Sequence, residues 1–216
     1  MWDEIVPLSP AHFFAFSADC SYVKGKRETP LSKKHFLPDL TEFHAAQSFA
    51  DVAVGWNEEG FFATFYVKEP IREIFFPDFQ DGDAIELFID TRDVKTSGFN
   101  TRFCHHFYFL PEPLETEEGA TIQTGEITRF RTEDAHELCD PSLLYVDCEK
   151  GRKDYRLHVF IPSECLNGFD PGQFDRLGFT YRIHRFKGNP QFFSASSEDF
   201  SIEQQPSLWA SLKLIK

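Results

Sequence analysis

Residues 51–67 read DVAVGWNEEGFFATFYV, and this stretch decides the fold class. Over 51–56 the apolar side chains occupy every second position, which is the pattern of a strand with one buried face. Residues 57–60, NEEG, supply turn chemistry, and 61–67 form a second apolar run rich in aromatic residues. The stretch therefore predicts a β-hairpin.

Strand patterns recur at short intervals along the rest of the chain. Residues 84–91, AIELFIDT, place Glu86 and Phe88 on the face opposite to the aliphatic residues. Further strands are predicted over 101–110, 121–131, 143–149, 154–161, 176–186, 190–196 and 207–214. Pro111 and Pro113 are expected to end the first of these strands. No segment sustains an amphipathic helix of three turns. We therefore predict an all-β fold, an antiparallel β-sandwich of about ten strands with jelly-roll or immunoglobulin-like layers.

Length and charge narrow the class of protein. A chain of 216 residues with 41% hydrophobic and 26% charged residues favours one globular domain over 1–216. The formal net charge of −13 argues against nucleic acid as the main partner, because nucleic acids reward clustered Lys and Arg. No apolar run approaches the length needed to cross a bilayer, so no membrane insertion is expected. The first residues, MWDEIVPLSP, lack the pattern of a secretion signal, so a cytoplasmic location is expected.

The number and spacing of the cysteines do not indicate a set of disulfide bonds. The chain has five of them, an odd number, without a C-x-x-C pair. They are Cys20, Cys104, Cys139, Cys148 and Cys165. We expect reduced and mostly buried thiols rather than disulfides or a zinc site.

Several segments together resemble a known family. Residues 54–67, VGWNEEGFFATFYV, and 81–90, DGDAIELFID, are similar to the "W-D-x-x-Y-L-Y-V" and "D-x-V-E-I-F-I-D" patterns of family-9 carbohydrate-binding modules and the wider DOMON-like sandwiches. YRLHVFIP at 155–162, LGFTYR at 177–182 and LWASLKL at 208–214 continue the likeness in the same order. The resemblance covers about 50–216. It implies a family-like core over 51–216, with an extra strand and loop region over 1–50.

The resemblance also implies a sugar site. In the family, two aromatic side chains clamp a sugar, and polar groups on adjacent strands bind its hydroxyls. Glu86 matches the family's glutamate, and Phe79 is nearest to the position of one clamp tryptophan. Phe200 is nearest to the second. Cys104 and His106 occupy the positions at which the next strand of the family carries Arg and Asn.

Strand alternation suggests a polar patch on its own grounds. Arg102, His106 and Tyr108 share one face of the predicted strand 101–110. If this strand lies beside 84–91, these side chains converge with Glu86. Sugar recognition needs such a combination of flat aromatic surface and a few hydrogen-bonding groups. The alternative is an ion pair between Arg102 and Glu86 on the sheet surface, which contributes about 0–1 kcal/mol.

The metal-binding residue types form no recognised ligand set. His105 and His106 are adjacent on a strand and point to opposite faces, so they cannot both bind one ion there. A Cys104 and His106 pair could, with a carboxylate from elsewhere. A structural calcium ion is a further candidate, since oxygen ligands are concentrated in Asp78, Asp81, Asp83 and Asp90. The alternative for these aspartates is a set of solvated acidic turns.

The motifs of common enzymes are absent: the sequence has no G-x-S-x-G, P-loop, G-x-G-x-x-G or H-E-x-x-H pattern. We therefore predict a non-catalytic module that binds a glycan or small saccharide through an aromatic and polar patch. The predicted ligand-binding residues are Phe79, Glu86, Arg102, His106, Tyr108 and Phe200. The rival is a DOMON-like sandwich reused for protein–protein interaction without sugar binding, which the missing clamp tryptophans favour. A hydrolase that uses two of the many carboxylates is a third candidate.

Overall fold

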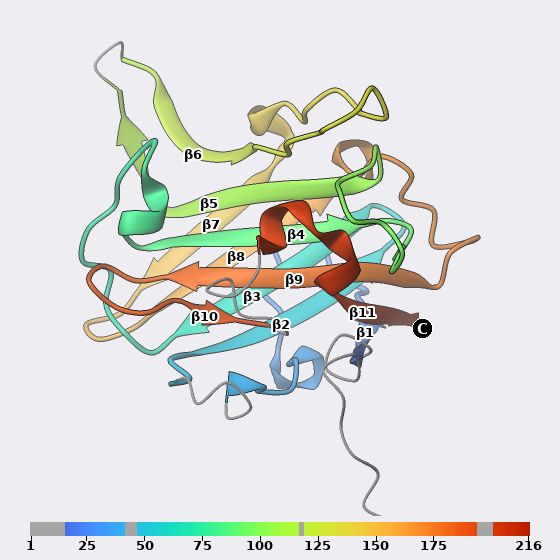
Figure 1. The fold of residues 1–216 in the computed structure, drawn as a ribbon. Helices are drawn as coiled ribbons and strands as arrows, with labels where there is room; N and C mark the ends of the chain where they lie inside the picture. The colour runs from blue at the N-terminus through green and yellow to red at the C-terminus, as the bar shows by residue number, and fades with distance from the viewer. Residues whose placement is uncertain (1–15, 42–46, 117–118, 194–200) are drawn as a thin grey trace, which may run out of the picture.

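The computed structural model describes residues 16–41, 47–116, 119–193 and 201–216, and over these residues the chain forms eleven strands (Figure 1). The strands are β1 (Ser17–Tyr22), β2 (Ala50–Asn57), β3 (Gly60–Val67), β4 (Ala84–Asp90), β5 (Cys104–Glu115), β6 (Thr121–Glu126), β7 (Tyr145–Lys150), β8 (Tyr155–Pro162), β9 (Arg176–His184), β10 (Gln191–Phe192) and β11 (Ala210–Ile215). The helices described are single 3-10 turns, η1 (Lys33–His35), η3 (Phe79–Asp81), η4 (Pro141–Leu143), η5 (Ser163–Cys165), η6 (Ile202–Gln204) and η7 (Pro206–Leu208). Within the described residues, no helix has the length and apolar character needed to cross a membrane.

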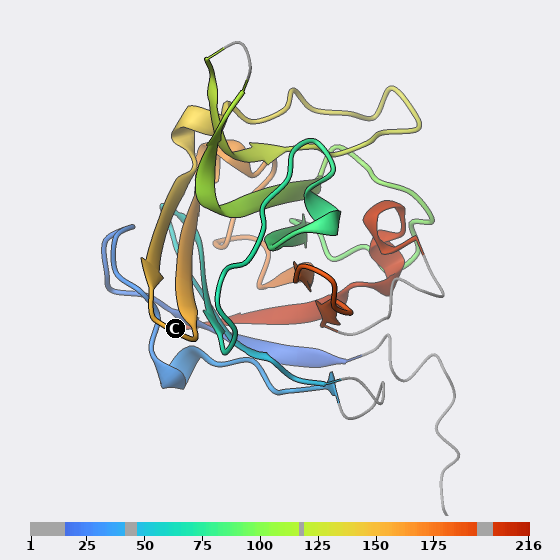
Figure 2. The ribbon, with the colours of Figure 1, turned by 90° about the vertical axis from the view of Figure 1, so that its left-hand side faces the viewer.

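All eleven strands belong to one continuous sheet. The hydrogen-bonded order is β6-β5-β4-β9-β11-β1-β2-β3-β8-β7, with β10 paired to β9 outside this path. The sheet rolls over on itself, so that the half containing β5, β4 and β9 faces the half containing β2, β3 and β8 (Figures 1 and 2). Its two ends come close, because β5 and β7 are also in contact. This differs from the predicted pair of separate layers.

The hydrophobic core fills the space between the two halves of the sheet. It includes Ile85, Leu87 and Ile89 of β4, Phe107 and Phe109 of β5, Phe179 and Tyr181 of β9, Val52 and Val54 of β2, and Phe61 and Phe65 of β3. Phenylalanine side chains from β3, β5 and β9 therefore meet in this core. Since side chains alternate along a strand, the same strands direct Glu86, His106 and Arg182 to the opposite face. Both η3 and η6 lie on that outer side of the β5-β4-β9 half (Figure 2).

The predicted hairpin of residues 51–67 is confirmed as β2 and β3, paired from Ala50–Val67 to Asn57–Gly60. The side chain of Asn57 closes the turn by accepting hydrogen bonds from the backbone N–H groups of Glu59 (2.9 Å) and Gly60 (3.2 Å). A Cβ atom at Gly60 would lie 2.2 Å from the carbonyl oxygen of Ile161 on β8. Glycine is therefore required here by close backbone approach.

The prediction of a wholly antiparallel sheet is wrong for the first strand. β1 lies between β11 and β2 and is parallel to both. Parallel neighbours far apart in sequence produce no hairpin signal, so local patterns could not reveal this pairing.

The predicted strand over 101–110 is displaced toward the C-terminus. It begins at Cys104 and continues through Pro111 and Pro113 to Glu115. The prolines are tolerated because the ladder between β5 and β6 is interrupted between Phe109 and Leu114, where no backbone N–H donor is required.

The expectation of five reduced cysteines is also wrong. Cys139 and Cys165 form a disulfide, with their Cα atoms 5.0 Å apart. The bridge ties the segment that follows β6 to η5. The two residues are 26 positions apart and share no characteristic spacing motif, so only the tertiary fold reveals the pair.

Candidate functional site

A buried carboxylate organises the outer face of β4, β5 and β9. Glu86 of β4 lies opposite Arg182 of β9 in the sheet register. Its Oε2 accepts hydrogen bonds from Nε of Arg182 and from Nε2 of His184, the latter 2.7 Å away. Its Oε1 accepts from Nε2 of His106 of β5 (2.9 Å) and from Nε2 of Gln80 of η3 (3.2 Å). We call these five residues the Glu86 network.

The network keeps Glu86 ionised in a buried position. Its side chain is fully buried, and those of His106, Arg182 and His184 are 7–8% exposed. Burial disfavours the charged carboxylate, but the hydrogen bonds from His106, His184 and Arg182 outweigh it. The pKa of Glu86 therefore lies well below its ordinary value. The guanidinium of Arg182 supplies a permanent opposite charge.

A pocket of about 370 Å³ lies next to this network. Its lining includes His106 and Gln80, whose side chains both hydrogen-bond to Glu86. Among the described residues, the lining consists of Pro77, Asp78, Phe79, Gln80, Asp81, His106, Ile127, Arg129 and Glu203. Glu86 lies behind this wall and holds two of its members in place.

The charged groups of the pocket have unused hydrogen-bonding capacity. Within the described part of the chain, no hydrogen bond or ion pair joins the side chains of Asp78, Asp81, Arg129 or Glu203 to another residue. The backbone carbonyls of Arg129 and Glu203 both accept from the Asn100 side chain, at 3.1 and 2.9 Å, which fixes these two segments beside each other. The described lining thus combines three carboxylates, one guanidinium, one amide and the imidazole of His106 with the apolar surfaces of Pro77, Phe79 and Ile127.

The predicted aromatic residues take different places. Phe79 of η3 lines the pocket and stacks on Tyr108 of β5, with ring centroids 5.1 Å apart and planes 15° apart. Tyr108 lies on the same face of β5 as His106, beside Glu86 in the register, but behind Phe79 rather than in the pocket wall. Phe200 lies outside the described residues.

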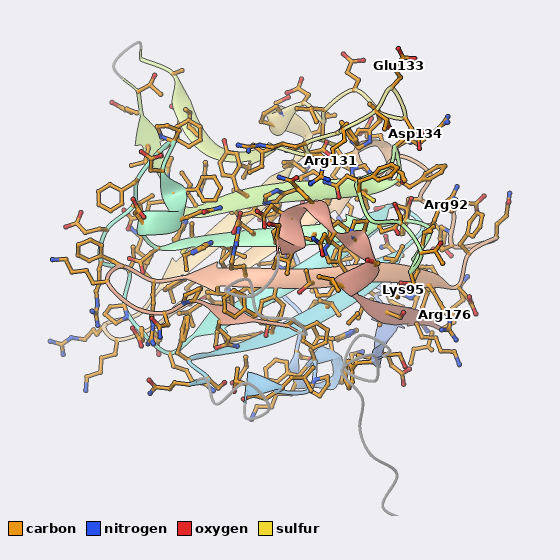
Figure 3. All side chains as sticks on the ribbon, in the orientation of Figure 1. Arg92, Lys95, Arg131, Glu133, Asp134 and Arg176 are labelled. Atoms are coloured by element: carbon orange, nitrogen blue, oxygen red, sulfur yellow. A yellow bond between two sulfur atoms is a disulfide. The ribbon has the colours of Figure 1, made fainter. Side chains whose placement is uncertain are left out.

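Arg102 is not part of this arrangement. Because β5 begins at Cys104, Arg102 lies in the preceding turn and forms an exposed ion pair with Asp134. Figure 3 shows Asp134 at the outer edge of the loop that follows β6. The guanidinium that meets Glu86 comes instead from Arg182.

Sequence reasoning missed Arg182 and His184. Both belong to the predicted strand over 176–186 and lie two positions apart, so alternation places them on one face. Two basic side chains on one face of an otherwise apolar strand are a detectable signal of a buried acidic partner. The sequence does not reveal that β9 lies beside β4, which supplies that partner.

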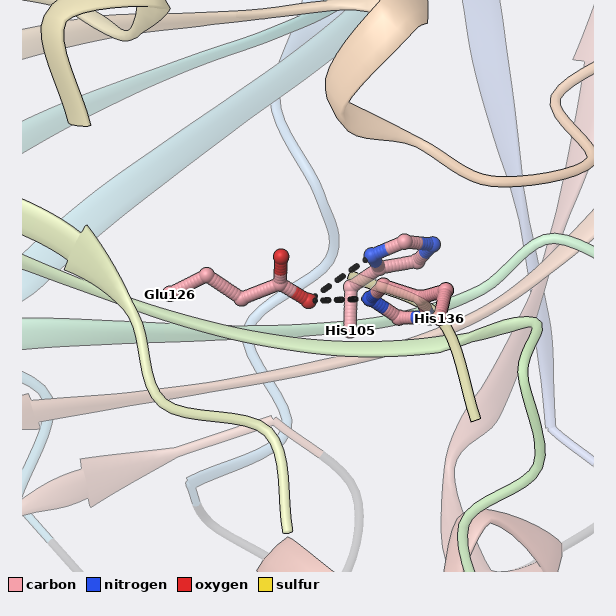
Figure 4. Close-up of side chains that lie close together, drawn as sticks. All are labelled: His105, Glu126 and His136. Carbon is pink, nitrogen blue, oxygen red and sulfur yellow. Dashed lines mark hydrogen bonds and ion pairs between the residues drawn. The ribbon is translucent and has the colours of Figure 1, made fainter. Parts of the chain in front are cut away.

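His105, the residue before His106, contacts a second buried glutamate, Glu126. His105 points to the opposite face of β5, as predicted, and its Nδ1 lies 3.0 Å from Oε1 of Glu126 at the end of β6. The same oxygen lies 2.8 Å from Nε2 of His136 and accepts from the Thr128 hydroxyl at 2.7 Å. The other oxygen, Oε2, accepts from the backbone N–H of Cys139 at 2.8 Å. We call these residues the Glu126 network (Figure 4).

Within the described residues, the candidate metal ligands named from the sequence do not gather into a cluster of three or more ligand atoms. The Cys104 thiol is buried, contacts Thr101 and packs near Phe88. Asp83 accepts from the backbone N–H groups of Arg72 and Glu73, and Asp90 from those of Arg92 and Val94. Asp78 and Asp81 line the pocket. Among the described residues, the cluster of three or more metal-ligand side chains is His105, Glu126 and His136. Calcium binding stays a prediction.

Comparison with known proteins supports the fold. No protein-family model matches the sequence, and no curated protein matches it. A family-9 carbohydrate-binding module from Caldicellulosiruptor kristjanssonii, solved with cellotriose, superposes with a TM-score of 0.60 at 13% identity, covering 92% of this chain and 93% of that one. Its complex with glucose gives the same score and identity, with 95% of that chain covered. A candidate carbohydrate-binding protein from Bacteroides uniformis superposes with a TM-score of 0.56 at 8% identity, covering 93% of this chain and 99% of that one. The predicted resemblance is thus confirmed at the level of the fold, which is that of the family-9 carbohydrate-binding modules.

Proposed function

We propose that this protein is a non-catalytic module that binds a neutral saccharide in the pocket beside the Glu86 network. The pocket itself carries the proposal. It joins hydrogen-bonding groups that have no side-chain partner among the described residues to apolar surface. It lies on the outer face of a sheet whose fold is shared with sugar-binding modules.

The chemistry of the lining suits a sugar. Carboxylates of Asp78, Asp81 and Glu203 accept hydrogen bonds from hydroxyl groups, and Arg129 and Gln80 donate to hydroxyl oxygens. Charge-assisted hydrogen bonds of this kind are among the strongest. The apolar surfaces of Pro77, Phe79 and Ile127 are available to the C–H groups of the ring. A volume of about 370 Å³ lies at the lower end of the range for small-ligand pockets, in keeping with a mono- or disaccharide.

The charge balance of the pocket selects against acidic sugars. Among the described lining residues, three carboxylates accompany one guanidinium, so an anionic ligand meets net repulsion. We expect neutral sugars to bind and uronic or sialylated sugars of equal size to bind at least about ten-fold more weakly, because one unfavourable charge contact of about 1.4 kcal/mol suffices for this difference.

The test is a glycan array on the folded protein, followed by calorimetry on each hit. Arg129→Ala alters an exposed pocket residue, so the fold should persist while affinity falls about ten-fold or more. His106→Ala should lower affinity as well.

The matched control is Arg102→Ala, which removes an exposed arginine outside the pocket. We expect this variant to bind the sugar as tightly as the unaltered protein. Absence of any saturable glycan binding, or equal losses in the Arg129 and Arg102 variants, would contradict the proposal.

An exposed aromatic pair favours protein association as a second candidate function. Phe75 and Phe76 are 38% and 40% exposed, and they line a neighbouring surface hollow with Ile74, Leu114 and Ile122. Exposed apolar patches of this kind are typical of interaction sites. A pull-down that captures a partner with the unaltered protein, but not with a Phe75→Ser, Phe76→Ser variant, would support this function.

A further inference from the structure

We propose that His105, Glu126 and His136 form a binding site for one divalent transition-metal ion, with zinc as the best match to the ligand set. The site lies on the core-facing side of β5, apart from the pocket. The three ligand atoms, Nδ1 of His105, Oε1 of Glu126 and Nε2 of His136, lie within 4.8 Å of one another (Figure 4).

The hydrogen-bonding pattern of His136 turns its Nε2 atom toward Glu126 as a candidate metal ligand. Its Nδ1 lies 2.8 Å from the backbone carbonyl oxygen of Arg102, which can only accept, so Nδ1 carries a proton. The other ring nitrogen, Nε2, faces a carboxylate oxygen 2.8 Å away. Either a second ring proton or a metal ion must therefore lie between these two atoms, and a metal ion can take the place of that proton. A carbonyl that fixes Nδ1–H and leaves Nε2 for the ion is the usual outer contact of a metal-bound histidine.

The negative charge of Glu126 also favours a bound cation. Its side chain is fully buried. Within the described residues its partners are two imidazoles, the Thr128 hydroxyl and the Cys139 N–H, without a lysine or arginine. A buried carboxylate without a fixed cationic partner gains from any bound cation.

The chemical types of the three ligand atoms favour zinc over calcium and magnesium. Two imidazole nitrogens and one carboxylate oxygen form the His₂Glu set found around zinc, with one coordination position left for a further ligand. Imidazole ligands disfavour calcium and magnesium, which take oxygen donors. Two of the three ligands also have outer contacts, since Thr128 and Cys139 hold the carboxylate of Glu126 and the Arg102 carbonyl holds the imidazole of His136. Nε2 of His105 is buried without a hydrogen-bond partner among the described residues.

The experiment is a zinc titration of the full chain, stripped with a chelator and free of any polyhistidine tag. Competition with a chromophoric chelator should show one zinc per chain. His136→Gln keeps a hydrogen bond to Glu126 but removes a ligand nitrogen, so affinity should fall about 100-fold or more. The matched control is His158→Gln on β8. His158 is another buried histidine with both ring nitrogens hydrogen-bonded, at 2.8 Å to Thr64 and 2.8 Å to the Arg27 carbonyl, away from the cluster.

A measurement on the unaltered chain covers the case in which a variant fails to fold. Anomalous diffraction at the zinc edge should place one peak about 2.0–2.2 Å from the three ligand atoms. The proposal is overturned if the unaltered chain binds no stoichiometric zinc. It is equally overturned if the peak lies elsewhere, or if His136→Gln binds zinc as tightly as His158→Gln.

Discussion

The chain places two adjacent histidines of β5 against two different buried glutamates. His106 meets Glu86 on the outer face of the sheet, and His105 meets Glu126 on the inner face. Each glutamate lies within hydrogen-bonding distance of four groups, two of them imidazoles. They differ in one respect: Glu86 also meets the guanidinium of Arg182, whereas no arginine or lysine reaches Glu126 among the described residues.

This difference separates a self-contained network from one that depends on a cation. Arg182 balances the charge of Glu86 permanently, so His106 is available to line the pocket. Glu126 must draw its positive charge from a proton or a metal ion. The hydroxyl of Thr128 links the two networks, because it accepts from the backbone N–H of His106 and donates to Glu126.

The largest effect should follow removal of Glu86. Glu86→Ala leaves the buried guanidinium of Arg182 without its partner, which should lower the free energy of unfolding by about 3–5 kcal/mol. Denaturant unfolding followed by fluorescence measures the loss. A double variant, Glu86→Leu with Arg182→Met, removes both charges and should recover much of it. A single-variant loss below about 1 kcal/mol would show that Glu86 and Arg182 are not paired in solution.

The disulfide beside the Glu126 network should have the next largest effect. Replacing Cys139 and Cys165 together by serine should cost about 2–4 kcal/mol, because the unfolded chain regains the freedom of the closed loop. Hydrogen exchange should show the loss of protection at the backbone N–H of residue 139, which donates to Glu126, with β4 unchanged. The matched control is Cys148→Ser, a free cysteine on β7. An equal loss in the control would contradict the assignment of the bridge.

Glu126→Gln should cost less than removal of Glu86. The variant keeps an acceptor oxygen and leaves no buried arginine without its partner. We therefore expect the free energy of unfolding to fall by about 1–3 kcal/mol because of imperfect hydrogen bonding. Thermal unfolding of both variants in a chelator-containing buffer compares them directly. A larger loss for Glu126→Gln than for Glu86→Ala would reverse the proposed roles of the two networks.

Acid should lower the free energy of unfolding through Glu86 by a smaller amount than the Glu86→Ala substitution. Protonation removes the charge of Glu86 but keeps its side chain in place. The hydrogen bonds from His106, His184 and Arg182 hold the folded pKa of Glu86 well below the ordinary value of 4.5. A carboxyl with a depressed folded pKa contributes stability above the unfolded pKa and loses it as pH falls toward the folded value. Stability should therefore decline below about pH 4.5. Denaturant unfolding at several pH values measures this dependence. The free energy of unfolding should change less with pH in Glu86→Gln than in the unaltered protein, and equal slopes would contradict the prediction.

The sequence predicts only some of the contacts that build these two networks. Period-two alternation gives the hairpin of β2 and β3, the opposite faces of His105 and His106, and the shared face of His106 and Tyr108. These are properties of one strand or of two strands joined by a tight turn. The pairing of Glu86 with Arg182 depends on the neighbourhood of β4 and β9, which lie far apart in the chain.

The remaining errors have the same physical origin. A shift of three residues in the start of β5 moves Arg102 from the sheet face to a turn. His136 and Cys139 lie on an irregular loop, where no period indicates the direction of a side chain. Loop residues of this kind are placed by tertiary contacts such as the disulfide.

The pairing of the first strand with the last has a consequence for how the chain folds. β1 is synthesised first, yet most of its hydrogen bonds go to β11, from Ser17–Ser211 to Ser21–Ile215. The sheet can therefore close only after the final strand has left the ribosome. Such a high contact order predicts slow folding, with open edges on β11 and β2 until β1 inserts. During that interval the nascent protein is an expected client for chaperones.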